Sequence, residues 1–173
     1  MRRAISLGLL IIINFAIQTT LTGFHVVGNI TPNLMLILTM SFGLMRGRKE
    51  GMLVGFFCGF LTDCYMTSLL GPFMFLYMLI GYLNGFFHKN YMIEDVLMPL
   101  LVIIVDEIVF NTCVFLVYFL LRNRLEFLAY FKGVIIPEAL STALLTIIIY
   151  KLYVSINKHL KKMSNKTKIH RLN

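Results

Sequence analysis

The sequence predicts an all-α integral membrane protein with about six transmembrane helices in one bundle. Its 173 residues are 58% apolar and only 14% charged, with a mean hydropathy of +0.82. A soluble domain has roughly 45 to 50% apolar and about 25% charged residues. Apolar runs of more than about 18 residues recur from one end of the chain to the other, which leaves no stretch for a separate soluble domain.

The spans are placed by length, because a helix rises about 1.5 Å per residue and needs about 20 apolar residues to cross a bilayer. Asn29, Pro32 and Asn33 crowd the start of the second span, so only the part after Pro32 is predicted to be helical. Pro137 lies near the beginning of the sixth span. The predicted spans are residues 4–21, 26–44, 51–66, 69–87, 96–121 and 133–153.

Basic residues predict the orientation, since Lys and Arg in short loops remain on the cytoplasmic side. In the six-span arrangement only Arg122, Arg124 and Lys132 fall on the outer side, together with the loops near Phe24 and Asp63. Both termini are then cytoplasmic. The basic residues on the cytoplasmic side are Arg2, Arg3, Arg46, Arg48, Lys49, Lys89, Lys151, Lys158, Lys161, Lys162, Lys166, Lys168 and Arg171.

The chain is predicted to divide into a transmembrane bundle, residues 1–156, and a basic cytoplasmic tail, residues 157–173. The tail has too few apolar residues to bury, so we expect it to be mobile or to lie along anionic lipid headgroups. Arg2 and Arg3 before an apolar run resemble a secretory signal, but no small-residue cleavage site follows. An uncleaved first helix is therefore predicted.

Glycines recur every four residues in the third and fourth spans, which places small residues on one face of each helix. Because no hydrophobic force drives helix association in lipid, such faces associate by close backbone approach. Two interpretations stay open: packing between these two neighbouring helices, or docking of a partner's transmembrane helix. The residues concerned are Gly51, Gly55, Gly59, Gly81 and Gly85, with Gly71 in the turn between the spans.

Asp63 closes the third span and precedes the turn Leu70-Gly71-Pro72. An acid there can accept hydrogen bonds from the unpaired amides that begin the fourth helix, where the positive end of the helix dipole also favours a negative charge. Contact with a partner is the alternative role.

Asp106, Glu107 and Asn111 lie about halfway along the fifth span, where an acid such as Asp costs roughly 2.5 to 3.5 kcal/mol on insertion scales. All three can point into the bundle, and Glu138 is a fourth polar group that can approach the same interior. One interpretation is a site for coupled protons or a substrate. The other is a polar pin, in which these groups hydrogen-bond to a neighbouring helix or a partner subunit.

No enzyme motif, cofactor site or metal site is found in the sequence. There is no phosphate-binding loop, GxSxG, HExxH or zinc spacing, and the four histidines stand singly. Cys58, Cys64 and Cys113 are interpreted as packing residues. The basic residues cluster between apolar runs rather than on one face, which argues against nucleic acid as a partner.

From Pro32 to Phe87 the chain resembles the rod shape-determining protein MreD family. The resemblance is carried by Pro32-Asn33-Leu34, the basic turn Arg46-Gly47-Arg48, the glycines and Asp63 described above, Leu70-Gly71-Pro72 and Gly81-Tyr82-Leu83. Asn33 stands where that family often has aspartate. The resemblance implies a small scaffold without chemistry of its own in the bacterial cytoplasmic membrane, acting in the cell-elongation machinery that organises peptidoglycan synthesis.

The resemblance also implies partners and a fold. The partners would be an MreC-like membrane protein and, indirectly, MreB, RodA and a class B penicillin-binding protein. The fold would be similar to the substrate-binding subunits of energy-coupling-factor transporters. An alternative function is therefore the substrate-binding subunit of a vitamin or metabolite importer, with Asp106, Glu107, Asn111 and Glu138 orienting a ligand.

Overall fold

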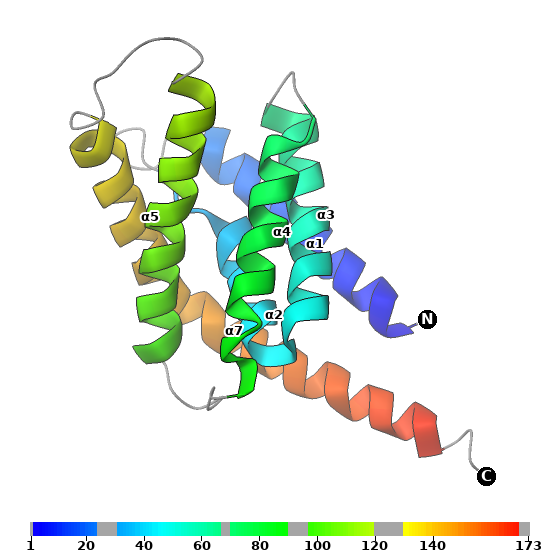
Figure 1. Ribbon diagram of the computed structural model, residues 1–173. Coiled ribbons are helices and arrows are strands. Elements are labelled where there is room, and N and C mark those ends of the chain that lie inside the picture. Colours follow the sequence, from blue (N-terminus) through cyan, green and yellow to red (C-terminus); the bar gives the residue numbers. More distant parts are fainter. Residues whose placement is uncertain (1, 24–30, 67–69, 90–96, 120–129, 170–173) are drawn as a thin grey trace.

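The computed structural model describes residues 2–23, 31–66, 70–89, 97–119 and 130–169. Helices account for nearly all of these residues (Figure 1). The predicted loops around Phe24 and Arg122 lie outside the described residues. The helices are α1 (Arg2–Gly23), α2 (Leu34–Arg46), α3 (Arg48–Met66), α4 (Pro72–Asn84), α5 (Leu97–Phe119) and α7 (Ile136–Ile169), with short turns η1 (Phe87–Lys89) and η3 (Phe131–Ile135).

Three helical segments of the described chain are long and apolar enough to cross a membrane. They are Ile5–Thr22, Leu97–Val117 and Phe131–Asn157. The apolar helices α2 and α4 have 13 residues each, which makes them about 20 Å long and shorter than the roughly 30 Å hydrocarbon core. The described part thus contains the expected six α-helices, while a six-span topology remains a proposal.

Helix α2 is the central element of the molecule, and every residue from Leu34 to Met45 is buried. It contacts α1, α3, α4, α5 and α7, which surround it. The prediction that helix begins only after Pro32 is correct, because Asn33 is the N-cap of α2. Within the described residues the predicted span 26–44 is helical from Leu34 onward, and residues 24–30 lie outside them. This short helix is enclosed by the other helices.

Helix α7 begins with an irregular turn and is much longer than predicted. Pro137 has no N–H to donate, and the preceding residues 131–135 form the wider π-helical turn η3. The helix then continues to Ile169, whereas the sequence predicted a span ending at Tyr153. The first part of the basic tail is therefore helical and projects from the bundle (Figure 1).

The two ends of the bundle differ in the elements they carry. The turn between α2 and α3 lies at the lower end in Figure 1, and the start of α1 and the end of α7 lie toward the lower right side. The turn between α3 and α4 lies at the upper end. The basic end, defined here as the end with Gly47, thus also holds Arg46 and Arg48.

Candidate functional site

The glycines of α3 and α4 face each other at backbone contact. A Cβ atom on Gly55 would overlap the carbonyl oxygen of Tyr77, and one on Gly59 would overlap the backbone of Met74. Gly51 and Gly81 oppose each other in the same way. Gly85 is equally close to the backbone of Arg48, so the contact continues to the basic end. The structure therefore shows packing between neighbouring helices, the first of the two interpretations of this pattern.

This packing leaves no room for a partner on the same glycines, because α4 occupies the face that Gly51, Gly55 and Gly59 form on α3. The docking interpretation of that face is therefore corrected. Gly71 has another role, since its φ of 132° belongs to a conformation that side-chain-bearing residues rarely adopt. It shapes the turn from which α4 starts.

Asp63 caps the N-terminus of α4. Its Oδ2 accepts hydrogen bonds from the backbone N–H groups of Gly71 and Met74 at 3.0 and 2.9 Å, and its Oδ1 accepts one from Phe73 at 3.1 Å. The residue is only 1% exposed. This is the capping role predicted for Asp63, and it satisfies amides that a helix start otherwise leaves unpaired. A side chain so buried offers little surface to a partner.

Asn33 joins three helices at the start of α2. Its Oδ1 accepts hydrogen bonds from the backbone N–H of Leu36 at 3.1 Å and from the hydroxyl of Tyr77 at 2.8 Å. Its backbone N–H donates to Oγ1 of Thr142 in α7 at 3.1 Å. The next amide, of Leu34, donates to Oε1 of Gln18 in α1 at 2.7 Å. Asn33 therefore fixes α2 against α4 and α7 without any charge, and the amide of Leu34 adds the contact with α1.

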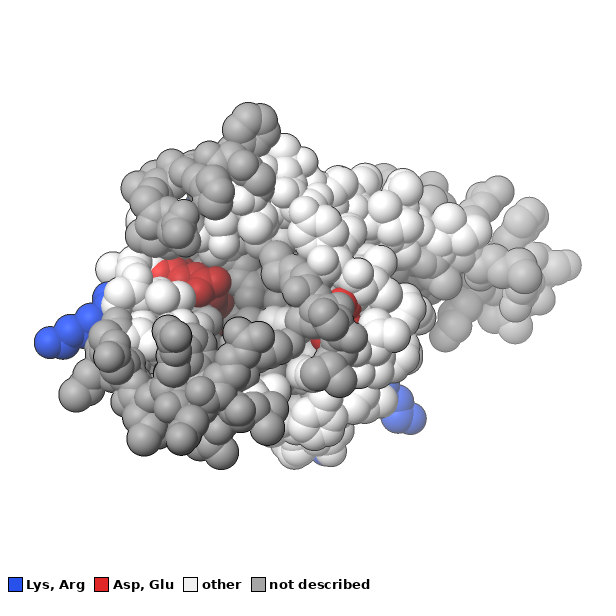
Figure 2. Space-filling model, turned by 90° about the horizontal axis from the view of Figure 1, so that it is seen from above, with Lys and Arg blue, Asp and Glu red and all other residues white. Residues whose placement is uncertain are grey.

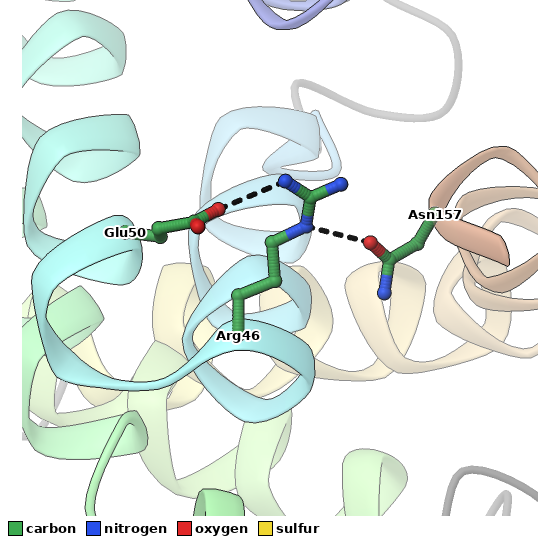
Figure 3. A network of polar contacts seen from close by, with 3 residues as sticks. All are labelled: Arg46, Glu50 and Asn157. Atoms are coloured by element: carbon green, nitrogen blue, oxygen red, sulfur yellow. Dashed lines mark hydrogen bonds and ion pairs between the residues drawn. The ribbon is translucent and has the colours of Figure 1, made fainter. Parts of the chain in front are cut away.

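Arg46 ties the basic end together (Figure 3). Its Nε donates to Oδ1 of Asn157 in α7 at 2.6 Å, and its Nη1 pairs with Oε2 of Glu50 in α3 at 2.9 Å. The Arg46 side chain is 6% exposed, so the desolvated guanidinium depends on these partners. Its side chain also lies over the ring of Phe42, with 5.2 Å to the centroid. Sequence reasoning used Arg46 for the topology and for the basic turn of the family resemblance, and missed this contact with α7.

The four predicted polar groups of the bundle interior separate into two sets. Asp106 Oδ2 accepts a hydrogen bond from Nδ2 of Asn84 in α4 at 2.6 Å. Glu107 is fully buried, and its Oε1 accepts from Nδ2 of Asn111 at 3.4 Å. Asn111 of α5 and Glu138 of α7 line the same cavity. The expected cluster therefore contains Glu107, Asn111 and Glu138, while Asp106 is paired with Asn84 instead.

A cavity of about 170 Å³ adjoins this cluster. Its lining combines aromatic rings with amides, hydroxyls and one carboxyl group, and it draws on α1 to α5 and α7. It lies in the half of the bundle away from Arg46, toward the end seen in Figure 2, where acidic side chains appear in two places and a basic side chain lies at the left edge. The lining residues are Phe15, Gln18, Thr19, Thr31, Asn33, Met35, Thr62, Tyr65, Phe73, Tyr77, Phe110, Asn111, Val114 and Glu138.

The importer hypothesis required four polar groups around one ligand, and the cavity presents two of them. Asn111 and Glu138 line it, whereas Asp106 and Glu107 do not. Gln18, Asn33 and Tyr77 line it as well and were not predicted. Asn33 could have been found from its N-cap position before an apolar run, but Gln18 gives no local signal. The described residues hold no group of three or more His, Cys, Asp or Glu side chains that could bind a metal ion.

Comparison with known proteins identifies the family. The family model described as rod shape-determining protein MreD matches residues 1–156, which is most of the chain. No curated protein and no solved structure matches the chain in the corresponding searches. The match extends the resemblance seen between Pro32 and Phe87 to the first, fifth and sixth predicted spans. The chain therefore belongs to the rod shape-determining protein MreD family.

Proposed function

We propose that the protein is a non-catalytic membrane scaffold of the bacterial cell-elongation machinery, inserted in the cytoplasmic membrane with both termini in the cytoplasm. The observation that carries this proposal is the family match over residues 1–156, because membership in this family implies a role in rod shape determination. The orientation is supported by the basic end, which gathers Arg46, Arg48 and the continuation of α7.

The described polar side chains support a structural role, since many are used to hold the helices together. Asp63 caps α4, Asn33 joins α2 to α4 and α7, and Arg46 joins α2 to α3 and α7. A scaffold of this kind acts by position. Holding two membrane proteins in one complex raises their effective concentration and requires no new chemistry. The proposed direct partner is an MreC-like membrane protein, with RodA, a class B penicillin-binding protein and MreB engaged indirectly.

The partner helix is proposed to dock on α1, since α4 already covers the glycines of α3. The apolar segment of α1 has the smallest buried share of the three segments that can cross a membrane, 17%. A Cβ on Gly8 would meet nothing within 4 Å, and the neighbouring Ile5 and Ile12 are 69% and 58% exposed. A small residue between exposed apolar side chains permits close approach of a second helix in lipid.

The test depletes the protein in its own cells and replaces it with variants while cell width is measured. Gly8→Leu fills the open position on α1 and should widen or round the cells and reduce co-purification of the MreC-like partner. Gly133→Leu is the matched control, because Gly133 also has nothing within 4 Å but lies in η3. Rod-shaped cells after depletion would contradict the scaffold function. Equal partner recovery with both variants would contradict docking on α1.

A further inference from the structure

The cavity has features that helix packing alone does not explain. Its volume of about 170 Å³ is close to that of an engineered protein cavity of about 150 Å³ that binds benzene. Such dry cavities are lined by apolar groups, whereas this one also exposes the side chains of Gln18, Asn111 and Glu138 to the same space. Polar groups that converge on an aromatic-lined hollow are typical of small-molecule sites.

The described residues that line the cavity include one acidic residue, Glu138, and no Lys or Arg. Glu138 lines the cavity from α7, and Asn111, which donates to the carboxyl group of Glu107, lines it from α5. Glu107 is 0% exposed, and its Oε2 has no hydrogen-bond partner in the described part of the chain. The one ion pair formed between described residues, Arg46 with Glu50, lies at the opposite end of the bundle. Carboxyl groups in this position favour an added cation.

The rest of the wall suits the same kind of ligand. Phe15, Tyr65, Phe73, Tyr77 and Phe110 place aromatic rings around the space, and aromatic faces attract organic cations. The Oδ1 of Asn33 already accepts two hydrogen bonds and Oε1 of Gln18 accepts one. The carboxyl group of Glu138 is thus the strongest acceptor that the cavity offers to a donor.

We propose that this cavity is a binding site for a small organic ammonium ion, with Glu138 receiving the ammonium group and the aromatic rings enclosing its short apolar part. Asn111, which donates to the carboxyl group of Glu107, offers a second polar side chain to the same space. The volume limits the ligand to about the size of benzene or a short alkyl chain. The inference concerns ligand binding alone, so it does not depend on the scaffold function and can fail or succeed separately from it.

The test compares n-butylammonium with n-butanol, a neutral molecule of nearly the same shape, and with butyrate as an anion. Binding to the purified full-length protein in mild detergent is measured as a rise in Tm with probe concentration at constant ionic strength. A thiol-reactive dye can report unfolding through the fully buried Cys58 once the exposed Cys64 is replaced by serine. The expected result is a saturable rise with n-butylammonium and no comparable rise with n-butanol or butyrate. Equal shifts with all three probes, or none, would overturn the proposal.

Two variants locate the effect. Glu138→Gln keeps the size of the side chain and should weaken n-butylammonium binding by about tenfold or more, since a charge-assisted hydrogen bond is lost. Asp106→Asn is the matched control, because Asp106 is a second acid of the interior that does not line the cavity. Equal binding by Glu138→Gln and the unaltered protein would overturn the site assignment.

A side chain of a partner protein is the competing occupant. In that case a purified MreC-like partner should block n-butylammonium, and replacing a basic residue of the partner should restore probe binding. This pair of results would overturn the proposal of a free small-molecule ligand. Simultaneous binding of partner and probe would support it.

Discussion

Replacement of Gly55 by alanine tests the packing of α3 against α4 with the smallest possible change. The new methyl group would lie well inside 3.0 Å of the carbonyl oxygen of Tyr77, so the two helices must part by roughly 1 Å to restore ordinary contact. Overpacking of this kind costs about 1 to 3 kcal/mol, and more where backbone atoms are involved. The gain in helix propensity is about 1 kcal/mol and opposes this loss.

Gly8→Ala is the matched substitution. It brings the same gain in helix propensity, about 1 kcal/mol, but the methyl group meets nothing within 4 Å. We therefore expect Gly8→Ala to raise Tm by about 2 to 4 °C and Gly55→Ala to lower it. The protein contains no tryptophan, so unfolding is best followed by the reaction of buried Cys58 with a thiol-reactive dye in mild detergent, in a background in which the exposed Cys64 is replaced by serine.

The comparison has a clear refuting outcome. If Gly55→Ala were as stable as Gly8→Ala, the α3–α4 contact would not be the close backbone contact described above, and the face of Gly55 would again be available to a partner. A normal amount of inserted Gly55→Ala protein that unfolds at lower temperature would agree with the structure.

Further predictions concern the polar contacts. Asp63→Ala should lower the free energy of unfolding by about 3 kcal/mol, because three amides at a buried helix start lose a charged acceptor. A loss no larger than that of an ordinary surface substitution in the same dye assay would contradict the role of Asp63 as the N-terminal cap of α4. Asn33→Ala should lower the free energy of unfolding by about 2 kcal/mol in the same assay. The double variant Asn33→Ala/Tyr77→Phe should recover part of that loss, because it no longer leaves the hydroxyl of Tyr77 buried without an acceptor. Arg46→Ala should speed hydrogen exchange in the amides of residues 157–169, whereas Arg48→Ala, at an exposed position, should leave it unchanged. Equal exchange rates in the two variants would refute the contact between Arg46 and Asn157.

Much of the architecture could be predicted from local signals. Proline and asparagine before an apolar run locate the start of α2, since Pro32 disfavours helix before it and Asn33 is a good N-cap. The cap formed by Asp63 follows from an acid at one helix end and a Gly-Pro turn at the next helix start. The spacing of glycines predicts close packing, although it does not tell which helix the glycines contact.

The contacts between distant segments could not be predicted in this way. Arg46 and Asn157 are 111 residues apart in the sequence. A basic residue at a helix end is already explained by the orientation of the chain in the membrane, so its contact with α7 gives no separate signal. Full burial of α2 has no signature either, because an apolar helix surrounded by protein has the same composition as one that faces lipid. The cavity depends on side chains from six helices, and Gln18 gives no indication of it in the sequence.

The most direct test of the scaffold function is recovery of partners from the protein's own membranes. The tagged chain is purified after solubilisation in mild detergent, and co-purifying proteins are identified and quantified by mass spectrometry. The account predicts an MreC-like protein in near-stoichiometric amount together with a cell-wall synthase, and loss of both with Gly8→Leu. Recovery of a folded protein with neither partner, or with an ATP-hydrolysing transport module instead, would contradict it.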